Sequence, residues 1–330
     1  MAGFLLRRLI YLLVLVVIST SVAYLLAATE LNPRARYQGR NPPPPTAVVD
    51  AALDVLNMND KVPVLRRFGT WAGGLVHGDL GRTIDNQPVN DEIGRRIWVS
   101  LRLVLVGAFV GTFLGVAAGA YSAVKQYQLA DRVLTVFSFV VLSIPAVVLG
   151  VLFKNAGIGL NKALGFTEGA RLLYTTGEIT PGLDPWSWGG IVNRLAHLAL
   201  PSMVLIVIAV AFYGRYQRNA MLDVLGSDFL RTARAKGLSR SRALIKHGLR
   251  TALIPMATFF AYEFALLFVG ATFTERLFGW HGMGEYFVES VTKNDVNSVA
   301  GVTLFVGILV LLAGFLSDIA YAALDPRVRV

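Results

Sequence analysis

The 330-residue chain contains no cysteine, so disulfide bonds, thiolate chemistry and cysteine-ligated zinc or iron–sulfur centres are excluded. Histidines are also scarce, and the four present, at positions 77, 197, 247 and 281, are too scattered to predict a metal site. Only 16% of the residues are charged, whereas soluble domains carry about 25%. Because 55% of the residues are hydrophobic, the net charge of +10 indicates a membrane protein rather than a nucleic-acid-binding domain.

Six apolar stretches are long enough to cross a bilayer as helices, which takes roughly 20 residues for about 30 Å of hydrocarbon. The first stretch exceeds the apolar core of a cleavable signal peptide, which is only about 7–15 residues long, so we expect it to be retained. The sequence therefore predicts an all-α integral membrane protein with six transmembrane helices, which are Leu9–Ala28, Leu103–Val124, Val133–Phe153, Leu195–Gly214, Thr251–Thr274 and Val299–Tyr321.

The orientation follows from basic residues close to the spans, which resist translocation. Arg7 and Arg8 place the N-terminus in the cytoplasm, and six crossings return the C-terminus there. On this scheme 125–132 and 215–250 are cytoplasmic. The cytoplasmic segments carry a charge of +11, while the extracytoplasmic segments, 29–102, 154–194 and 275–298, carry +1.

The long extracytoplasmic segment after the first span divides the chain into three parts, 1–28, 29–102 and a core of five spans, 103–330. Four consecutive prolines at 42–45 must be extended and cannot continue a helix. After them the sequence predicts two short helices, Ala47–Leu56 and an amphipathic one at Val64–Leu75.

The cytoplasmic loop 215–250 is the most informative segment, because it holds nine basic and two acidic residues. Ser227 is a candidate N-cap, Asp228 stands at the positive end of a helix dipole, and Gly237 can end the helix in a left-handed conformation. This predicts a helix of about nine residues, which is marginal alone in water. Phe229 and Leu230 are its candidate anchors, and small Ala233 and Ala235 allow close approach of another surface.

Ser239 or Ser241 is expected to cap a second helix that continues into the fifth span. The alternative for the whole loop is an ordinary positive-inside segment whose charges face water or anionic lipid. The aromatic and charge patterns of a nucleic-acid site are absent.

The stretch Arg231–Gly237, followed by Pro255 eighteen residues after its glycine, resembles the cytoplasmic "EAA" loop of binding-protein-dependent ABC importer permeases. Residues 228–255, DFLRTARAKGLSRSRALIKHGLRTALIP, resemble the B-type permease subunit of oligopeptide and dipeptide importers, and segments at 78–96, 143–150, 275–284 and 324–329 fit the same family. The resemblance implies a type I ABC importer permease fold. It also implies an ATPase-coupling loop made of Asp228, Phe229, Leu230, Arg231, Thr232, Ala233, Arg234, Ala235, Lys236 and Gly237.

The resemblance further implies the partners of this chain. These are a second, homologous permease, two ATPase subunits or one fused ATPase, and an extracytoplasmic peptide-binding protein, all acting on a peptide substrate at the bacterial plasma membrane. The chain contains no G-x-x-x-x-G-K-[ST] phosphate loop. We therefore expect no catalytic residue, metal or cofactor in this chain, with ATP and magnesium bound by the partners and no role for nucleic acid.

Two acidic residues fall within predicted spans. A carboxylate in the bilayer usually faces protein or water, so Glu263 is a candidate for the translocation path, where it would bind a peptide amino terminus. The alternatives are that it pairs with a basic group of the partner subunit or is protonated. Asp318 lies near the inner end of the last span, where a structural role is favoured. Pro145 is expected to kink the third span.

Two other interpretations stay open at this point. The same importer class carries nickel chelates or glutathione, and these relatives share the loop signatures. An ion-coupled secondary transporter or channel would instead use Glu263 and Asp318 as ion-binding groups, but it would leave the cytoplasmic helix unexplained.

Overall fold

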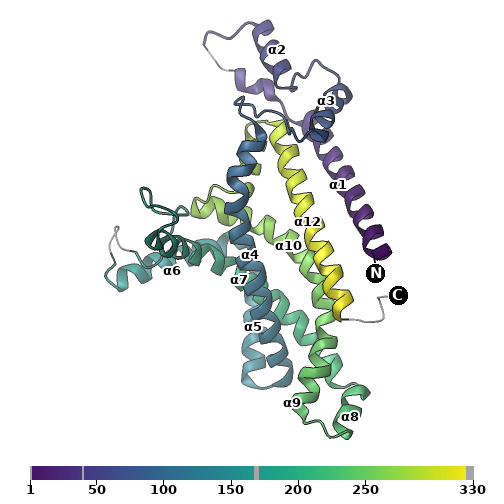
Figure 1. The fold of residues 1–330 in the computed structure, drawn as a ribbon. Helices are drawn as coiled ribbons and strands as arrows, with labels where there is room; N and C mark the ends of the chain where they lie inside the picture. Colours follow the sequence, from purple (N-terminus) through teal and green to yellow (C-terminus); the bar gives the residue numbers. More distant parts are fainter. Residues whose placement is uncertain (1, 39–40, 167–170, 325–330) are drawn as a thin grey trace. The chain divides into compact units, whose positions relative to one another are not determined.

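The computed structural model describes residues 2–38, 41–166 and 171–324, without the side chains of 2–6, 240–241, 257–258, 261–270 and 322–324. These residues are mostly helical, and the only β pairing among them is one bridge between Arg82 and Pro88 (Figure 1). The helices in chain order are α1 (Ala2–Glu30), η1 (Pro33–Tyr37), α2 (Thr46–Val55), α3 (Val64–Val76), α4 (Val89–Val124), α5 (Leu129–Ser143), α6 (Ala146–Ala163), α7 (Trp188–Leu225), α8 (Asp228–Ala235), α9 (Arg240–Ala243), η2 (Leu244–Leu249), α10 (Arg250–Phe278), α11 (Met283–Thr292) and α12 (Val296–Leu324).

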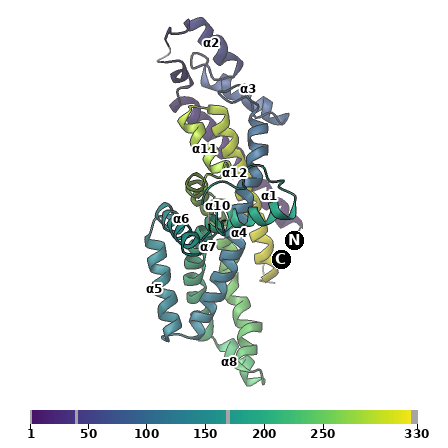
Figure 2. The same ribbon diagram turned by 90° about the vertical axis from the view of Figure 1, so that its left-hand side faces the viewer.

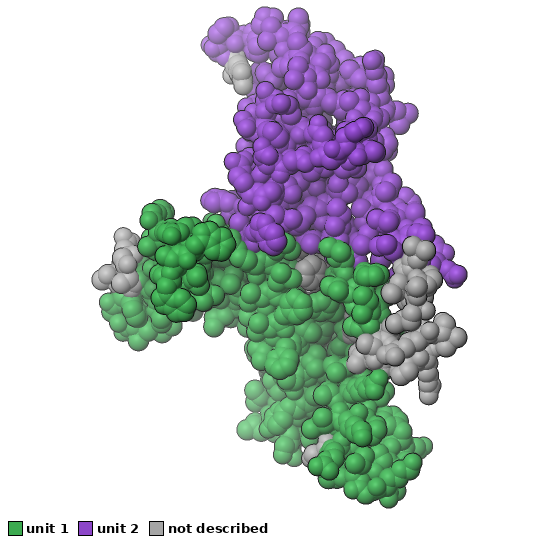
Figure 3. All heavy atoms as spheres, in the orientation of Figure 1, with its two compact units in different colours: residues 1, 101–280, 312–330 green, residues 2–100, 281–311 purple. Residues whose placement is uncertain are grey.

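The chain forms two compact units, coloured separately in Figure 3. Among the described residues, unit 1 contains 101–280 and 312–324, and unit 2 contains 2–100 and 281–311. The long helices α4 and α12 contribute residues to both units. The early segment 29–100 therefore groups with a late one, 281–311, which no local sequence pattern indicates.

The helices that could span a membrane agree in part with the six spans predicted from the sequence. Four helices are long and apolar enough to span a bilayer, with bounds Arg7–Glu30, Val89–Val124, Trp188–Leu225 and Val296–Tyr321. A bent pair, α5 with α6, makes up to five. The remaining predicted span, Thr251–Thr274, lies in α10, where ten consecutive side chains fall outside the described residues. Among the described residues the structure thus supports four or five spans, and the count of six stays a prediction.

The third predicted span is broken rather than kinked. α5 and α6 are bent by 109° at Ile144 and Pro145. Ile144 is extended (φ −95°, ψ 126°), since the ring of a following proline disfavours the helical region, and Pro145 cannot donate a backbone hydrogen bond. The single helix expected over Val133–Phe153 is therefore wrong.

Helix α7 is the centre of unit 1, where it packs against α5, α6 and α10; Figures 1 and 2 show α5 and α7 side by side. It also lies against α4 along a row of glycines spaced four residues apart. A Cβ atom at Gly111 would lie 2.5 Å from the Cβ of Ala209, and one at Gly119 would lie 2.3 Å from the carbonyl oxygen of Gly214. Small residues at this spacing let two helix backbones approach closely in lipid. The four glycines of the row are Gly107, Gly111, Gly115 and Gly119.

Unit 2 contains the two predicted short helices, which are confirmed as α2 and α3 within a residue of their expected bounds. Their apolar faces share one core with the end of α1 and the start of α12. In it the ring of Tyr24 stacks on Trp71, with centroids 4.8 Å apart. Packing on its own unit thus explains the amphipathic pattern of α3.

Candidate functional site

Helix α8 forms in loop 215–250 where the sequence predicts a helix, over Asp228–Ala235. It belongs to unit 1, where it contacts α9 and η2, and it lies at the bottom of Figure 2. Its eight residues are too few for a stable isolated helix, so its contacts decide whether it persists.

The end of α8 has the geometry that the sequence predicts. Gly237 is left-handed (φ +91°) and donates its N–H to the carbonyl of Arg234 at 3.0 Å. The N–H of Leu238 reaches the carbonyl of Ala233 at 3.3 Å. This pair of bonds is a Schellman motif, which satisfies carbonyls at the helix end and favours glycine at the left-handed position.

The start of α8 differs from the expectation. Ser227 occupies the N-cap position with an extended backbone (φ −74°, ψ 145°), but its side chain makes no capping bond. The hydroxyl instead donates to the carbonyl of Val224 at 2.6 Å, at the end of α7. Serine hydroxyls commonly choose between such local partners. Ser227 therefore ties α8 to α7.

One side of α8 is buried on its own unit. Leu230 is 6% exposed, and it packs with half-buried Ala233 and Leu238. The surface beneath is built from the ends of α4, α7, α9 and α10, with buried members Ala123, Met221, Val224, Ala243 and Ala252. Burial of Leu230 contributes about 2 kcal/mol and holds the short helix in place.

The other side of α8 is open. Of the two candidate anchors, Leu230 is buried on its own unit while Phe229 is 43% exposed, and anchoring by Phe229 stays a prediction. An ion pair on this helix joins Arg231 to Asp228 at 3.5 Å, between side chains that are 77% and 95% exposed. The exposed residues are Asp228, Phe229, Arg231, Thr232, Arg234, Ala235, Lys236 and Gly237.

The chain after α8 continues into α10 as the sequence predicts. Ser239 accepts a bond from the N–H of Arg242 at 3.4 Å, so it is the cap and begins α9. A turn of π-helix, η2, then connects α9 with α10. Buried Gly248 in η2 leaves room for its neighbours, because an added Cβ would lie 3.3 Å from Val224 and 3.6 Å from Leu230. The segment beneath α8 is thus helical from Arg240 onward.

Sequence reasoning missed a buried carboxylate near this end of unit 1. Asp131, 3% exposed, accepts two bonds from Arg218, at 2.5 and 2.9 Å. It also accepts from the hydroxyl of Ser122 at 2.5 Å and the N–H of Tyr127 at 2.9 Å. The cluster ties the end of α4 and the start of α5 to α7. Loop 125–132 holds one acidic residue, but its partner is 87 positions away.

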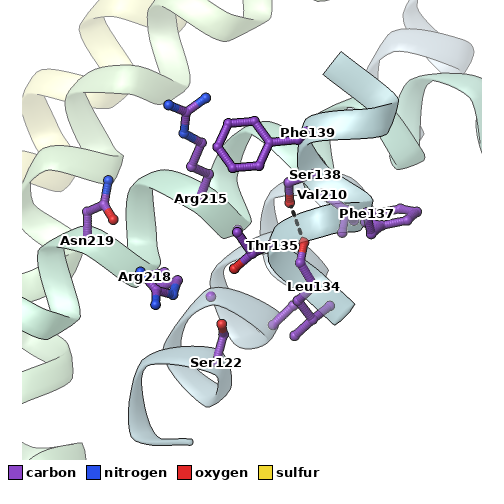
Figure 4. Close-up of a pocket in the computed structure, with 13 residues that line it drawn as sticks. Ser122, Leu134, Thr135, Phe137, Ser138, Phe139, Val210, Arg215, Arg218 and Asn219 are labelled. Carbon is purple, nitrogen blue, oxygen red and sulfur yellow. Dashed lines mark hydrogen bonds between the residues drawn. The ribbon is translucent and has the colours of Figure 1, made fainter. Parts of the chain in front are cut away.

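A pocket of about 260 Å³ lies next to this cluster, between α4, α5 and α7. Figure 4 shows that Arg215 and Arg218 approach it from α7. Arg218 is bound to Asp131, and the guanidinium of Arg215 stands 4.7 Å from the ring centroid of Phe139. Both cations therefore have partners in the chain, and they stabilise the packing of α5 on α7.

The candidate translocation residue Glu263 lies in α10, and its side chain falls outside the described residues. The structure does not place it in any path. Among the described residues there is no group of three or more His, Asp or Glu side chains that could hold a metal ion.

The all-helical fold, with its apolar spans and a short helix on a basic loop, is that of a membrane transport permease. Residues 111–330 match the family described as "Binding-protein-dependent transport system inner membrane component". The chain belongs to this family, which confirms the resemblance carried by the loop residues, and it is a multi-pass protein of the bacterial plasma membrane.

Similar proteins span nearly the whole chain. The oligopeptide transport system permease protein OppB of Mycobacterium tuberculosis is 51% identical over 330 residues, covering 100% of both chains. The dipeptide transport system permease protein DppB of Escherichia coli K12 is 30% identical and covers 81% of each. The fold is also similar to a chain of the MetNI methionine ABC transporter in an inward-facing conformation, with a TM-score of 0.52 at 19% identity, covering 71% of this chain and 96% of that one.

Proposed function

We propose that this chain is the membrane-spanning subunit of an ATP-driven ABC importer that takes up oligopeptides or dipeptides delivered by an extracytoplasmic binding protein. The proposal is supported by full-length similarity to permeases named for oligopeptide and dipeptide transport. These names do not favour nickel chelates or glutathione as the cargo. A self-contained secondary transporter or channel is likewise not favoured.

In this proposal α8 is the coupling helix. It docks on an ATPase subunit and transmits its closure to α7 and α10, while a second permease and a second ATPase site complete the importer. ATP and magnesium bind to the ATPase chains and not to this one. The observation that carries the proposal is the division of α8 into a buried side at Leu230 and an open, charged side from Asp228 to Lys236.

The test compares two glycines on either side of α8 that differ in backbone conformation. No atom lies within 4 Å of an added Cβ at either Gly237 or Gly226, but Gly237 is left-handed while Gly226 has φ −85°. A left-handed conformation costs a non-glycine residue about 1–2 kcal/mol. We expect Gly237→Val to distort the end of α8 and to reduce ATPase binding and ATP-dependent peptide uptake, whereas Gly226→Val retains most of both.

The measurement is pull-down of the co-expressed ATPase together with peptide uptake in proteoliposomes. Equal retention of binding and uptake in the two variants would overturn the placement of the coupling helix. A loss in both would indicate a general effect on the loop rather than on α8.

For Glu263 we propose a place along the translocation path, which rests on the cost of an unpaired carboxylate in a bilayer. Glu263→Gln removes the charge and keeps the shape. The proposal expects altered uptake of peptides with a free amino terminus relative to N-acetylated ones. Unchanged uptake for both kinds of peptide would remove Glu263 from the path.

A further inference from the structure

The pocket between α4, α5 and α7 lies where the sequence places the cytoplasmic boundary of the membrane. Arg215, which lines it, is the first residue after the predicted span Leu195–Gly214. Thr135, on its α5 wall, is the third residue of the predicted span that begins at Val133. All of its lining residues belong to unit 1. We therefore expect this pocket, of about 260 Å³, at the depth of the lipid headgroups.

Arg215 brings a guanidinium with unused donors to this pocket. The side chain is exposed, and its guanidinium lies 4.7 Å from the ring centroid of Phe139. Within the described part of the chain, no hydrogen bond or ion pair reaches its N–H groups. A guanidinium carries five such donors, and a charge at the edge of the hydrocarbon is costly without a partner. These donors therefore require an acceptor from outside the described chain.

Two more polar side chains of the pocket are available. Asn219 is exposed one turn further along α7, and Thr135 lies on the α5 wall (Figure 4). Among the described residues, neither side chain makes a hydrogen bond. Arg218 differs, because both bonds described above join it to Asp131. The pocket thus offers one uncompensated positive charge together with neutral hydrogen-bonding groups.

The surface around the pocket combines basic and apolar residues. Segments 125–132 and 215–219 hold four basic residues and one acidic residue, a surplus of three positive charges. Val133, Val136 and Phe139 follow one another every three residues on α5 and are 56%, 61% and 52% exposed. Tyr127, between α4 and α5, is 74% exposed, and aromatic residues are frequent at membrane interfaces. Basic groups attract anionic headgroups and apolar groups attract acyl chains, so this surface suits an anionic lipid.

We propose that this pocket binds the phosphate group of an anionic lipid of the cytoplasmic leaflet, with Arg215 as its main donor. A planar guanidinium suits phosphate because two of its N–H groups bond to two oxygens at once. Asn219 and Thr135 donate further bonds, and the acyl chains lie along the exposed side of α5. Such a lipid bridges α5 and α7. The proposal concerns the chain in its membrane and does not depend on the transported cargo.

Two other anionic groups are the competing occupants. A carboxylate of a transported peptide and a carboxylate of a second permease can each accept bonds from Arg215. The exposed apolar row on α5 favours a ligand that carries long apolar chains beside its anionic group. Lipids have this property, and a peptide terminus does not.

The experiment measures ligand binding to the full-length chain in detergent by native mass spectrometry. The probes are dioctanoyl phosphatidic acid and dioctanoylglycerol, which differ only in the phosphate group. We expect phosphatidic acid to bind at least about tenfold more tightly, because hydrogen bonds to a charged acceptor are the stronger ones. Equal binding of the two probes would overturn the proposal.

Inorganic phosphate separates a lipid from a free anion as the source of the phosphate group. At an equal concentration it should leave phosphatidic acid bound, because it lacks the acyl chains that contact α5. Complete displacement by inorganic phosphate would assign the pocket to a free anion and contradict the lipid.

The matched variants are Arg215→Gln and Arg242→Gln. Each removes one exposed arginine of unit 1, but Arg242 does not line the pocket. Arg215→Gln should weaken phosphatidic acid binding about tenfold, and Arg242→Gln should leave it unchanged. If Arg215→Gln proves unstable, Thr135→Val keeps the shape, removes the hydroxyl and is expected to weaken binding about threefold. Unchanged binding in a folded variant of either kind would overturn the assignment.

Two further measurements test the competing occupants. Co-expression with the second permease should leave phosphatidic acid bound, whereas its release on assembly would place the pocket in a subunit interface. Trialanine should not displace the lipid, whereas displacement that Arg215→Gln abolishes would place the pocket on the peptide path. Either of these contrary results would overturn the proposal.

Discussion

Unit 2 and helix α8 of unit 1 both carry charged side chains, but the chain uses these charges differently in the two regions. In unit 2, Arg34 pairs with Asp50 at 2.7 Å and with Asp60 at 2.5 Å. Asp295, 3% exposed, accepts bonds from the N–H groups of Ile84 and Ser298 at 2.8 and 3.0 Å. In α8 the ion pair between Arg231 and Asp228 is long and exposed.

The paired and buried charges of unit 2 stabilise its fold, whereas the exposed charges of α8 are available to another molecule. Loop 29–102 has nearly balanced charge, so its acidic and basic residues can satisfy one another within the chain. Loop 215–250 has a surplus of seven positive charges, which its own two acidic residues cannot neutralise. Arg231, Arg234 and Lys236 of this surplus are exposed on α8, which is the electrostatic property expected of a docking surface. The comparison predicts that stability and docking respond to different substitutions.

The largest effect is expected at Asp131 of unit 1, a buried charged residue that forms part of the fold. Asp131→Ala leaves Arg218 without its two bonds and should destabilise the chain by about 3 kcal/mol, or roughly 6–10 °C in Tm. Exposed Asp223 on α7 is the control, and Asp223→Ala should change Tm by less than about 2 °C. Differential scanning fluorimetry in detergent measures both, and equal Tm values would contradict a structural role for Asp131.

Two neighbouring arginines give the next effect, in unit 2. Arg67 is 4% exposed and donates to the carbonyls of Val62 and Ala28, each at 3.2 Å, whereas Arg66 is exposed. Arg67→Met should cost about 2 kcal/mol, because two carbonyls lose a charged donor. Arg66→Met should cost less than about 0.5 kcal/mol. Thermal unfolding of the two variants measures this difference in stability. Identical unfolding curves would show that the buried Arg67 stabilises the fold no more than the exposed Arg66 does.

A smaller effect is expected on the exposed face of α8, and on docking rather than stability. Arg234→Gln should change the free energy of unfolding by less than about 0.5 kcal/mol, but weaken ATPase binding about fivefold, which corresponds to about 1 kcal/mol. Arg66→Gln, an exposed arginine of unit 2, is the control and should leave ATPase binding intact. A loss of stability in Arg234→Gln, with ATPase binding unchanged, would show that Arg234 stabilises the fold and does not take part in docking.

The smallest effect is a local pH dependence in unit 2. The Lys61 ammonium and then the Arg34 guanidinium hold the pKa of Asp50 below its usual 3.8. A lowered folded-state pKa means that this stabilisation is present above about pH 3.8 and is lost as the pH falls through the folded value. Hydrogen exchange of the α2 amides, corrected for intrinsic rates, should therefore accelerate below about pH 4. Asp50→Asn should abolish that acceleration, and its persistence would assign the effect to another group.

Local sequence patterns predict the elements that depend on neighbouring residues. The bounds of α8, the left-handed Gly237, the Ser239 cap and the helices α2 and α3 all follow from caps, turns and apolar spacing within a few residues. The break at Ile144 and Pro145 was underestimated as a kink, although the steric effect of a proline on the residue before it is also local.

What the sequence does not predict depends on contacts between distant segments. Arg218 lies 87 positions from Asp131, and no local pattern pairs them. The glycine row on α4 has recognisable four-residue spacing, but its partner surface on α7 emerges only in three dimensions. Ser227 occupies the predicted N-cap position, but its hydroxyl donates to the carbonyl of Val224 instead of capping α8, because a serine hydroxyl has several local partners within reach.

The central claim is that this chain transports peptides only when partner ATPases drive it. The most direct measurement is uptake of a radiolabelled peptide into proteoliposomes that contain either this chain alone or this chain with its co-expressed permease, ATPases and binding protein, each with and without ATP. The account predicts uptake only in the assembled importer with ATP. Peptide uptake by this chain alone would contradict it.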